Sequence, residues 1–196
     1  MRTVAVIGAG QMGSGITQTI AQFGMKVLLA DVDLAVAEKA KAGIDTALGR
    51  LVGRGKITPD EATAAIARVT PIGDYAPMAE ADLIIEAATE REEIKRKIFE
   101  VAGKVLREDA IMASNTSSIP ITRMATSSPD PKRFIGLHFF NPVPVMGLIE
   151  VIPGLATSAD TIARTRAFAE SLNKQVVQAE DEPGFVVNRI LLPMIN

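Results

Sequence analysis

Short apolar runs alternate with longer amphipathic stretches along the whole chain. Runs such as Thr3–Ile7, Lys26–Ala30 and residues 81–86 are rich in aliphatic and β-branched side chains, which predicts buried strands. In residues 11–23 and 92–106, apolar side chains recur with the spacing of one helix face, which predicts helices. Strands that alternate with helices are typical of an α/β fold built on a doubly wound, mainly parallel sheet.

The same patterns predict the remaining elements. Thr58, Pro59 and Glu61 form a helix start signal, in which the threonine caps the helix and the glutamate stands at its third position. The run 140–150 has no room for a crossover helix, so the strands on either side of it are expected to be antiparallel. Further helices are expected at 34–55 and from Thr157 or Ser158 to about Leu172, and a short helix or turn at 119–126. Further strands are expected at 68–72, 110–113, 133–140, 148–152 and 175–177.

A glycine-rich loop joins the first predicted strand to the first predicted helix. In such a G-x-G-x-x-G loop, the first glycine permits a tight turn, the second lets the backbone approach a pyrophosphate, and the third lets the helix pack on the strand. Asp31 ends the second strand, where a carboxylate accepts hydrogen bonds from an adenosine ribose. This context predicts a Rossmann-type dinucleotide-binding domain, and a strand–turn–helix that serves packing alone is the alternative. The loop consists of Gly8, Ala9, Gly10, Gln11, Met12 and Gly13.

Composition narrows the classes of partner. The chain has 196 residues, a net charge of −2, one histidine and no cysteine. The small net charge gives no basic field that would indicate nucleic acid or an anionic membrane, and no apolar run approaches the ~20 residues of a membrane span. The cysteine and histidine counts exclude disulfides, thiolate metal sites and histidine-rich metal sites, and they fit a reducing compartment. We therefore expect a cytoplasmic protein without a metal, nucleic-acid or membrane partner.

The single histidine lies at the end of a predicted strand. His138 is thereby placed at the edge of the sheet where ligands bind in doubly wound folds. Glu150 follows on the returning strand, where hairpin pairing would place it beside the imidazole. A carboxylate bonded to one ring nitrogen fixes the tautomer and leaves the other nitrogen as a base. These residues leave two alternatives open, an acid–base dyad and a buried histidine satisfied by the backbone.

Other polar residues follow the ends of strands. Asn115 and Ser117 belong to the polar run 114–118, whose local pattern favours a capped turn. Contacts to a nicotinamide ribose and a substrate oxygen are the functional alternative. Glu90 and Lys95 lie at the start of the next predicted helix, where ligand contacts and solvated helix positions are equally compatible with the pattern. These four residues are therefore candidates without a decided role.

A basic cluster marks the end of the long helix at 34–55. Arg50 and Arg54 share one helix face, and Lys56 follows them. Solvated charge that complements the helix C-terminus is the usual explanation of such a cluster. Recognition of an anionic substrate group such as phosphate is the functional alternative.

Taken together, these stretches resemble the 3-hydroxyacyl-CoA dehydrogenase family, and within it the bacterial 3-hydroxybutyryl-CoA dehydrogenases. The resemblance runs from Val4 to Asn196, and the combination of HFFNP with PGFVVNR is its most specific part. The resembling stretches are VAVIGAGQMGSGI, DLIIEAATE, ASNTSSIPIT, GLHFFNPVPVM, LIEVI and EPGFVVNRILLPMIN.

The resemblance implies NAD as the cofactor and an acyl-CoA ester as the substrate, with interconversion of a short-chain 3-hydroxyacyl-CoA and its 3-keto form. It implies His138 as the catalytic base, Glu150 as its partner, and Ser117 and Asn188 as contacts to the reacting substrate. It also implies coenzyme A contacts near the long helix, where Ala47 stands in place of a serine that relatives often carry. The implied NAD contacts are residues 8–13, Asp31, Glu90, Lys95, Ser117 and Asn141.

Members of the family normally continue into a helical second domain that closes the active site and carries the dimer interface. We therefore expect residues 1–182 to form the NAD-binding domain and residues 183–196 to form a linker and the first helix of a truncated second domain. We expect that apolar last segment to self-associate, and the full-length protein to be a homodimer. A truncated NAD-binding module with little turnover is one alternative. Another hydroxyacid dehydrogenase is a second, although the glycine-rich helical segment with the catalytic lysine of the β-hydroxyacid dehydrogenases is missing.

Overall fold

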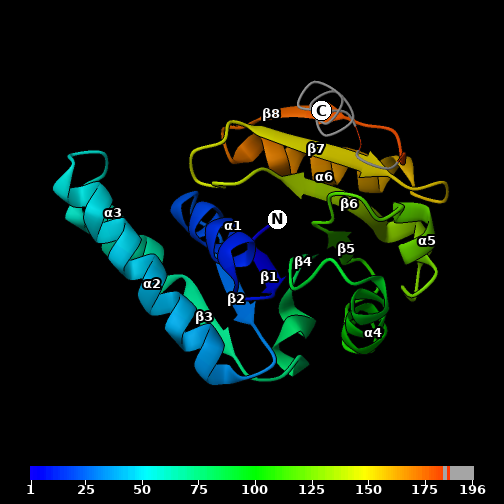
Figure 1. Cartoon of the computed structure of the whole chain (residues 1–196), viewed down its shortest axis with the longest axis horizontal. Coiled ribbons are helices and arrows are strands. Elements are labelled where there is room, and N and C mark those ends of the chain that lie inside the picture. Colours follow the sequence, from blue (N-terminus) through cyan, green and yellow to red (C-terminus); the bar gives the residue numbers. More distant parts are fainter. Residues whose placement is uncertain (183–184, 186–196) are drawn as a thin grey trace, which may run out of the picture.

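The computed structural model describes residues 1–182 and 185 of the chain. In this part, every predicted strand and helix is present, with ends that differ by a few residues, and two short 3₁₀ helices are additional (Figure 1). The elements are β1 (Thr3–Ile7), α1 (Gln11–Gln22), β2 (Lys26–Ala30), α2 (Leu34–Gly53), α3 (Pro59–Ala67), β3 (Val69–Ile72), η1 (Ala76–Glu80), β4 (Leu83–Glu86), α4 (Glu92–Ala102), β5 (Ile111–Ser114), α5 (Ile121–Ala125), η2 (Pro131–Arg133), β6 (Phe134–Phe139), β7 (Leu148–Pro153), α6 (Ala159–Ser171) and β8 (Gln175–Gln178).

All eight described strands belong to one sheet with the order β3-β2-β1-β4-β5-β6-β7-β8. The strands from β3 to β6 in this order are parallel, so their carboxyl ends meet at one edge. β7 pairs antiparallel with β6, and β8 runs parallel to β7. The predicted doubly wound sheet, with a reversal near its C-terminal end, is confirmed.

Alternating side chains of the buried strands supply two separate cores. Val4 and Val6 of β1 face a cluster that includes residues of α1, α2, α3 and α6. Ala5 and Ile7 of the same strand face the opposite cluster, which includes residues of η1, α4 and α5. A strand buried on both faces is continuously apolar, which is why the sequence pattern located β1 so clearly.

The helix α3 begins as the sequence predicts. The Thr58 hydroxyl accepts a hydrogen bond from the Glu61 backbone N–H at 3.2 Å, and the Glu61 carboxylate accepts one from the Thr58 backbone N–H at 2.7 Å. This reciprocal capping box satisfies two backbone donors that a helix start leaves open. Helices α2 and α3 form a hairpin that projects from one side of the sheet (Figure 1).

The buried face of α4 differs from the one that the apolar spacing predicts. Apolar spacing points to Ile94, Ile98, Val101 and Val105, but Val101 is 51% exposed in the structure. The fully buried positions of this helix are Lys95, Phe99 and Ala102. The buried face of α4 therefore differs from the expected one. Lys95 occupies a buried position, where its ammonium pairs with the Glu86 carboxylate.

Some expectations lie outside the described residues. The linker and helix expected at 183–196, its self-association and the position of Asn188 all fall there, apart from Phe185, which is described. Among the described helices, none is both long and apolar enough to cross a membrane.

Candidate active site

The glycine loop occupies the carboxyl end of β1, between β2 and β4. Gly8 has a φ of +104°, and a Cβ placed on it would lie 2.5 Å from the Ala88 Cα. A Cβ on Gly13 would lie 1.7 Å from the Gly8 carbonyl oxygen. Glycine is therefore required at both positions, one for the turn and its contact with the end of β4, the other for close packing of α1.

The second glycine of the loop has a different surrounding. A Cβ on Gly10 would meet no atom within 4 Å, so the backbone is open on that side. Gly10 also caps α1 without any side-chain hydrogen bond, which leaves the positive end of the helix available to an anion. These features fit the pyrophosphate of a dinucleotide.

Asp31 directly follows the last residue of β2, next to this loop. Its Oδ2 atom accepts a hydrogen bond from the Ala9 N–H at 2.6 Å, and its Oδ1 atom accepts one from the Val32 N–H at 2.7 Å. The carboxylate is thereby fixed beside the glycine loop, at the position where a dinucleotide-binding fold holds an adenosine ribose.

His138 and Glu150 face each other across β6 and β7. The two residues are direct partners in the antiparallel register, and the His138 Nδ1 atom lies 2.8 Å from the Glu150 Oε2 atom. His138 is only 6% exposed, and Glu150 is fully buried. The predicted hairpin pairing is confirmed, and the alternative of a histidine bonded to the backbone gives way to a carboxylate partner. With Nδ1 committed to Glu150, Nε2 is the ring nitrogen that can exchange a proton with a ligand.

Two phenyl rings flank the imidazole of His138. The Phe140 ring centroid lies 4.5 Å from that of His138, and the Phe185 ring centroid lies 5.8 Å from it. Sequence reasoning did not single out either phenylalanine. Both belong to the stretches HFFNP and PGF that carry the family resemblance, which is the signal that pointed to them.

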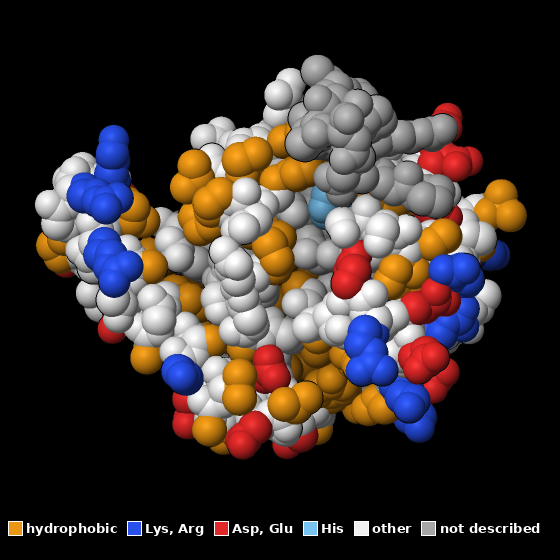
Figure 2. Space-filling view, viewed as in Figure 1, with side chains coloured by type: hydrophobic (Ala, Val, Ile, Leu, Met, Phe, Trp, Pro, Cys, Tyr) orange, Lys and Arg blue, Asp and Glu red, His pale blue; other side chains and the backbone are white. Residues whose placement is uncertain are grey.

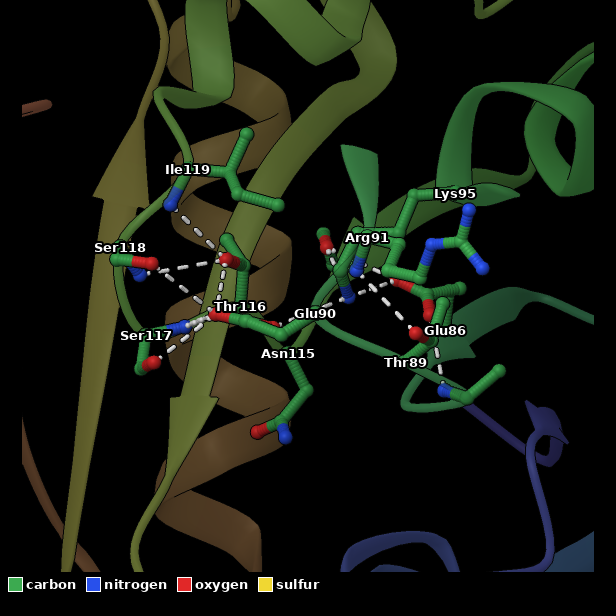
Figure 3. A network of polar contacts seen from close by, with 12 residues as sticks. Glu86, Thr89, Glu90, Arg91, Lys95, Asn115, Thr116, Ser117, Ser118 and Ile119 are labelled. Atoms are coloured by element: carbon green, nitrogen blue, oxygen red, sulfur yellow. Dashed lines mark hydrogen bonds and ion pairs between the residues drawn. The ribbon is translucent and has the colours of Figure 1, made fainter. Parts of the chain in front are cut away.

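Glu90 organises the polar segment that follows β5 (Figure 3). Its Oε1 atom accepts hydrogen bonds from the Thr116 hydroxyl at 2.7 Å, the Ser117 N–H at 2.7 Å and the Ser117 hydroxyl at 2.9 Å. Burial of the carboxyl raises the Glu90 pKa, but these hydrogen bonds and the nearby Lys95 ammonium outweigh burial, so the pKa lies below its ordinary value. Glu90 is therefore a charged anchor of the Ser117 segment and more than a solvated helix residue.

Lys95 is completely buried, so its interpretation as a solvated helix residue is wrong. Its Nζ atom lies 2.6 Å from the Glu86 Oε2 atom, and both side chains are at most 1% exposed. The Ser114 hydroxyl donates to the same Glu86 oxygen at 3.1 Å. Glu86 was not singled out from the sequence, because it reads there as the last residue of a strand.

Two asparagines connect the separate parts of this edge. The Asn115 Oδ1 atom accepts a hydrogen bond from the Phe139 N–H at 2.8 Å, which joins the end of β5 to β6 beside His138. The Gln11 side-chain amide donates to the Asn141 Oδ1 atom at 3.1 Å, which joins the glycine loop to the loop after β6. The structure thus brings the predicted dinucleotide residues and the dyad to one edge of the sheet.

The basic cluster lies away from this edge. Arg50, Arg54 and Lys56 are exposed at the outer end of the α2–α3 hairpin, where Figure 2 shows Lys and Arg side chains gathered. A groove of about 330 Å³ runs between α1, α2 and the loop after β6, and Ala47, Gln11 and Asn141 are among the residues that line it. The groove opens beside the glycine loop, between that loop and the hairpin.

An α/β sheet whose carboxyl edge combines a dinucleotide-type glycine loop with a buried His–Glu pair defines a nucleotide-dependent dehydrogenase. Comparison with known proteins gives the particular family. Residues 3–182 match the model of the 3-hydroxyacyl-CoA dehydrogenase NAD-binding domain, and the chain belongs to this family. The resemblance inferred from the sequence, the dehydrogenase class and NAD as the cofactor are thereby confirmed.

Similar proteins support the same assignment. The chain is 47% identical, over its whole length, to a 3-hydroxybutyryl-CoA dehydrogenase of Bradyrhizobium diazoefficiens, of which it covers 67%. It is 42% identical to the 3-hydroxyadipyl-CoA dehydrogenase of Escherichia coli, with 98% of the chain and 41% of that protein covered. The crystal structure of the (S)-3-hydroxybutyryl-CoA dehydrogenase of Ralstonia eutropha superposes with a TM-score of 0.98 at 44% identity, covering 100% of this chain and 69% of the other.

Proposed function

We propose that the protein interconverts (S)-3-hydroxyacyl-CoA and 3-ketoacyl-CoA esters, with the short-chain 3-hydroxybutyryl-CoA as the preferred substrate. The observation that carries this proposal is the buried pair of His138 and Glu150, 2.8 Å apart, at the edge that holds the glycine loop. The names of two similar proteins, both 3-hydroxybutyryl-CoA dehydrogenases, support the short acyl chain.

In the oxidative direction, His138 takes the proton of the substrate's 3-hydroxyl group through Nε2. Glu150, bonded to Nδ1, holds the ring in this tautomer and stabilises the imidazolium that forms. In the reductive direction, His138 returns the proton to the oxygen of the 3-keto group. NAD, when bound, supplies the redox chemistry by accepting or giving the hydride. The chain's own contribution is a base that is fixed in position and shielded by two phenyl rings.

The cofactor contacts are assigned to two groups of residues. Residues 8–13 and Asp31 hold the adenosine and pyrophosphate half, because they combine an open backbone, a helix start and a fixed carboxylate. The nicotinamide half lies toward the polar edge near His138. Residues assigned to that half are Glu90, Lys95, Asn115, Ser117 and Asn141, with Ser117 and Asn188 as additional contacts to the substrate.

The coenzyme A part of the substrate is assigned to the groove along α2. Its phosphates would meet Arg50, Arg54 and Lys56, which are exposed cations at the outer end of the hairpin. Ala47 lines the groove and offers a methyl group where a hydroxyl would donate a hydrogen bond. The coenzyme A part of the substrate is therefore recognised by the basic residues and by the shape of the groove, and not by a hydroxyl group at position 47.

The domain boundary is also part of this proposal. The region matched by the NAD-binding family ends at residue 182, which supports a boundary between 182 and 183. We assign residues 183–196 to the linker and first helix of a second, helical domain, and the homodimer to the full-length protein.

The direct test is oxidation of NADH in the presence of acetoacetyl-CoA, followed by absorbance. Longer 3-ketoacyl-CoA esters are assayed separately as alternative substrates. Turnover that is fastest with acetoacetyl-CoA supports the proposal. NADH binding without turnover would instead indicate a cofactor-binding module. Turnover with free 2- or 3-hydroxy acids and none with CoA esters would contradict the assigned substrate class.

A further inference from the structure

The Asp181 carboxylate joins the segment that follows β8 to the start of α5. Its Oδ1 atom accepts a hydrogen bond from the Ile121 N–H at 2.6 Å, and its Oδ2 atom accepts one from the Thr122 N–H at 2.8 Å. Both oxygens of one carboxylate are thus committed to successive backbone donors, and hydrogen bonds to a charged acceptor are the stronger kind. The proton transfer proposed above makes no use of this side chain.

The chain around Asp181 is held on both sides. After β8 ends, the Ala179 N–H still donates to the Val151 carbonyl oxygen of β7 at 3.0 Å. Beyond Asp181, the Phe185 N–H donates to the Glu182 carbonyl oxygen at 2.9 Å. Asp181 therefore lies between a contact with the sheet and a turn that ends at Phe185.

Phe185 is buried beside the proposed base. It belongs to the same apolar cluster as Ile119 and Ile121, and its ring centroid lies 5.8 Å from that of His138. Its φ of +47° lies in the left-handed region, which bulky side chains rarely adopt and which persists only where the surrounding contacts hold it. The contacts around this turn must therefore hold Phe185 in place, and the Asp181 carboxylate supplies two of them.

A helix cap that serves α5 alone is the alternative explanation for Asp181. Pro120 precedes α5 and gives it no side-chain cap, so an acceptor for the first N–H groups has to come from elsewhere. Helices α2, α3 and α6 are capped by the residue directly before them. Asp181 instead lies 60 positions along the chain from Ile121. A cap from so far away also fixes the segment that carries it, which a local cap cannot do.

We propose that Asp181 is a positioning residue for the acid–base pair: it fixes the segment after β8 on α5 and thereby holds the Phe185 ring against His138. This inference rests on the proposed function, in which His138 exchanges a proton with the substrate. The ring excludes water from a histidine that is 6% exposed and limits the orientations open to its imidazole. Asp181 acts through Phe185, because its own oxygens are engaged by the backbone of α5.

The single histidine of the chain gives this inference a direct readout. After isotopic labelling of histidine, the imidazole signals in an NMR spectrum belong to His138 alone, and they respond to the ring current of a neighbouring phenyl group. Phe185→Leu defines the shift that follows from loss of that group. We expect Asp181→Ala to move the His138 signals in the same direction and to give most of that shift. Spectra of all variants over the same pH series separate a change in ring current from a change in protonation.

Turnover with acetoacetyl-CoA and NADH is the second measurement. The kcat of Asp181→Ala should fall about tenfold or more, because small displacements around a reacting group have effects of at least this size. Its NADH affinity should stay within about threefold of the parent's, since Ser117 keeps its own anchor in Glu90. An unchanged kcat in a protein whose His138 signals have moved would overturn the inference.

The matched control is Asp130→Ala. Asp130 also caps a short helix, η2, by accepting a hydrogen bond from the Lys132 N–H at 2.9 Å. This helix precedes β6, and His138 lies near the other end of that strand. Both variants lose a capping carboxylate and should have a lower Tm, but only Asp181→Ala should move the His138 signals. Signals that stay at the parent's positions in a folded Asp181→Ala protein overturn the inference, as do equal shifts in the two variants.

Asp181→Asn carries the test if Asp181→Ala does not fold. Its amide oxygen can replace one of the two acceptors, while its amide nitrogen is a donor that faces another donor. We expect its His138 signals to lie between those of the parent and those of Phe185→Leu, and signals identical to the parent's overturn the inference. A parent chain without turnover would contradict the proposed function, whereas the His138 signals test the placement of Phe185 without turnover, so the two failures are distinguishable.

Discussion

Asp31 illustrates how one side chain can serve both the fold and the choice of ligand. Its carboxylate accepts hydrogen bonds from the N–H groups of Ala9 and Val32, so its position is fixed before any ligand arrives. A fixed negative charge at this place accepts from ribose hydroxyls and repels a 2′-phosphate. Asp33, two residues further on, carries the same charge but uses it to cap α2 through the Ala35 N–H at 2.9 Å.

These two aspartates give a matched pair of variants for cofactor choice. We expect NADH to be preferred over NADPH, and Asp31→Ser to reduce that preference about tenfold or more, equivalent to about 1.4 kcal/mol. Asp33→Ser keeps a capping hydroxyl and should leave the preference nearly unchanged. Apparent dissociation constants for both nucleotides provide the measurement. Equal binding of NADH and NADPH by the parent would contradict the role of Asp31.

The pair of His138 and Glu150 makes a second prediction at this scale. His138→Ala and Glu150→Gln should each lower kcat by about 10²–10⁴, as expected for the loss of acid–base catalysis, while NADH binding persists. The double variant should be no slower than the more damaged single variant, because the two side chains act as one unit. Steady-state kinetics would show the alternative directly, since losses that multiply would make Glu150 an independent structural residue.

At the scale of single elements, the hairpin of β6 and β7 was predictable and the face of α4 was not. The short loop of the hairpin excludes a crossover, so antiparallel pairing follows from length alone. The register observed in the structure then places His138 opposite Glu150. The burial of Lys95 depends on a carboxylate from β4 and a hydroxyl from β5, which helical periodicity does not contain. The expectation that only apolar side chains of a helix are buried therefore predicted the wrong face of α4.

The difference between these two faces can be measured. Phe99 is fully buried and makes an edge-on contact with Phe134, with ring centroids 4.8 Å apart. Phe99→Ala should lower the free energy of unfolding by about 3–5 kcal/mol because it leaves a cavity. Val101→Ala removes a half-exposed side chain and should change it by about 0.5 kcal/mol or less. Urea unfolding of both variants gives the comparison, and a larger loss for Val101→Ala would restore the face expected from the sequence.

At the scale of the whole molecule, the doubly wound, mainly parallel sheet follows from the pattern of apolar runs and helices, whereas the order of its strands comes from the structure. Parallel strands joined by helices leave few ways to arrange the chain, and a glycine loop after β1 places the ligand edge. The polar network around Glu90 was beyond such reasoning, because its members come from three segments that only the folded sheet brings together. The sequence therefore indicated Ser117 as a candidate but not the hydrogen bonds to Glu90 that hold it.

Binding of NADH should stabilise the whole molecule, and the glycine loop offers a way to separate folding from binding. With NADH at about 100 times its dissociation constant, linkage predicts about 2.7 kcal/mol of added stability. Gly10→Ala places a methyl group in open space, at a residue with a φ of −70°, so its unliganded stability should equal that of the parent. Its NADH-dependent increase in Tm should be lost, because the methyl group occupies the approach of the pyrophosphate. Gly13→Ala should unfold at a lower temperature even without ligand, and scanning calorimetry distinguishes the two.

The contact between Gly8 and the Ala87–Ala88 backbone joins two segments that leave the ribosome at different times during synthesis. β1 has β2 as one neighbour in the sheet and β4 as the other, and β4 leaves the ribosome after β2, α2, α3 and β3. The contact of the glycine loop with Ala88 needs this later segment. His138 and Glu150 emerge later still, so a nascent chain holds all residues of its nucleotide cradle before it holds those of its acid–base pair.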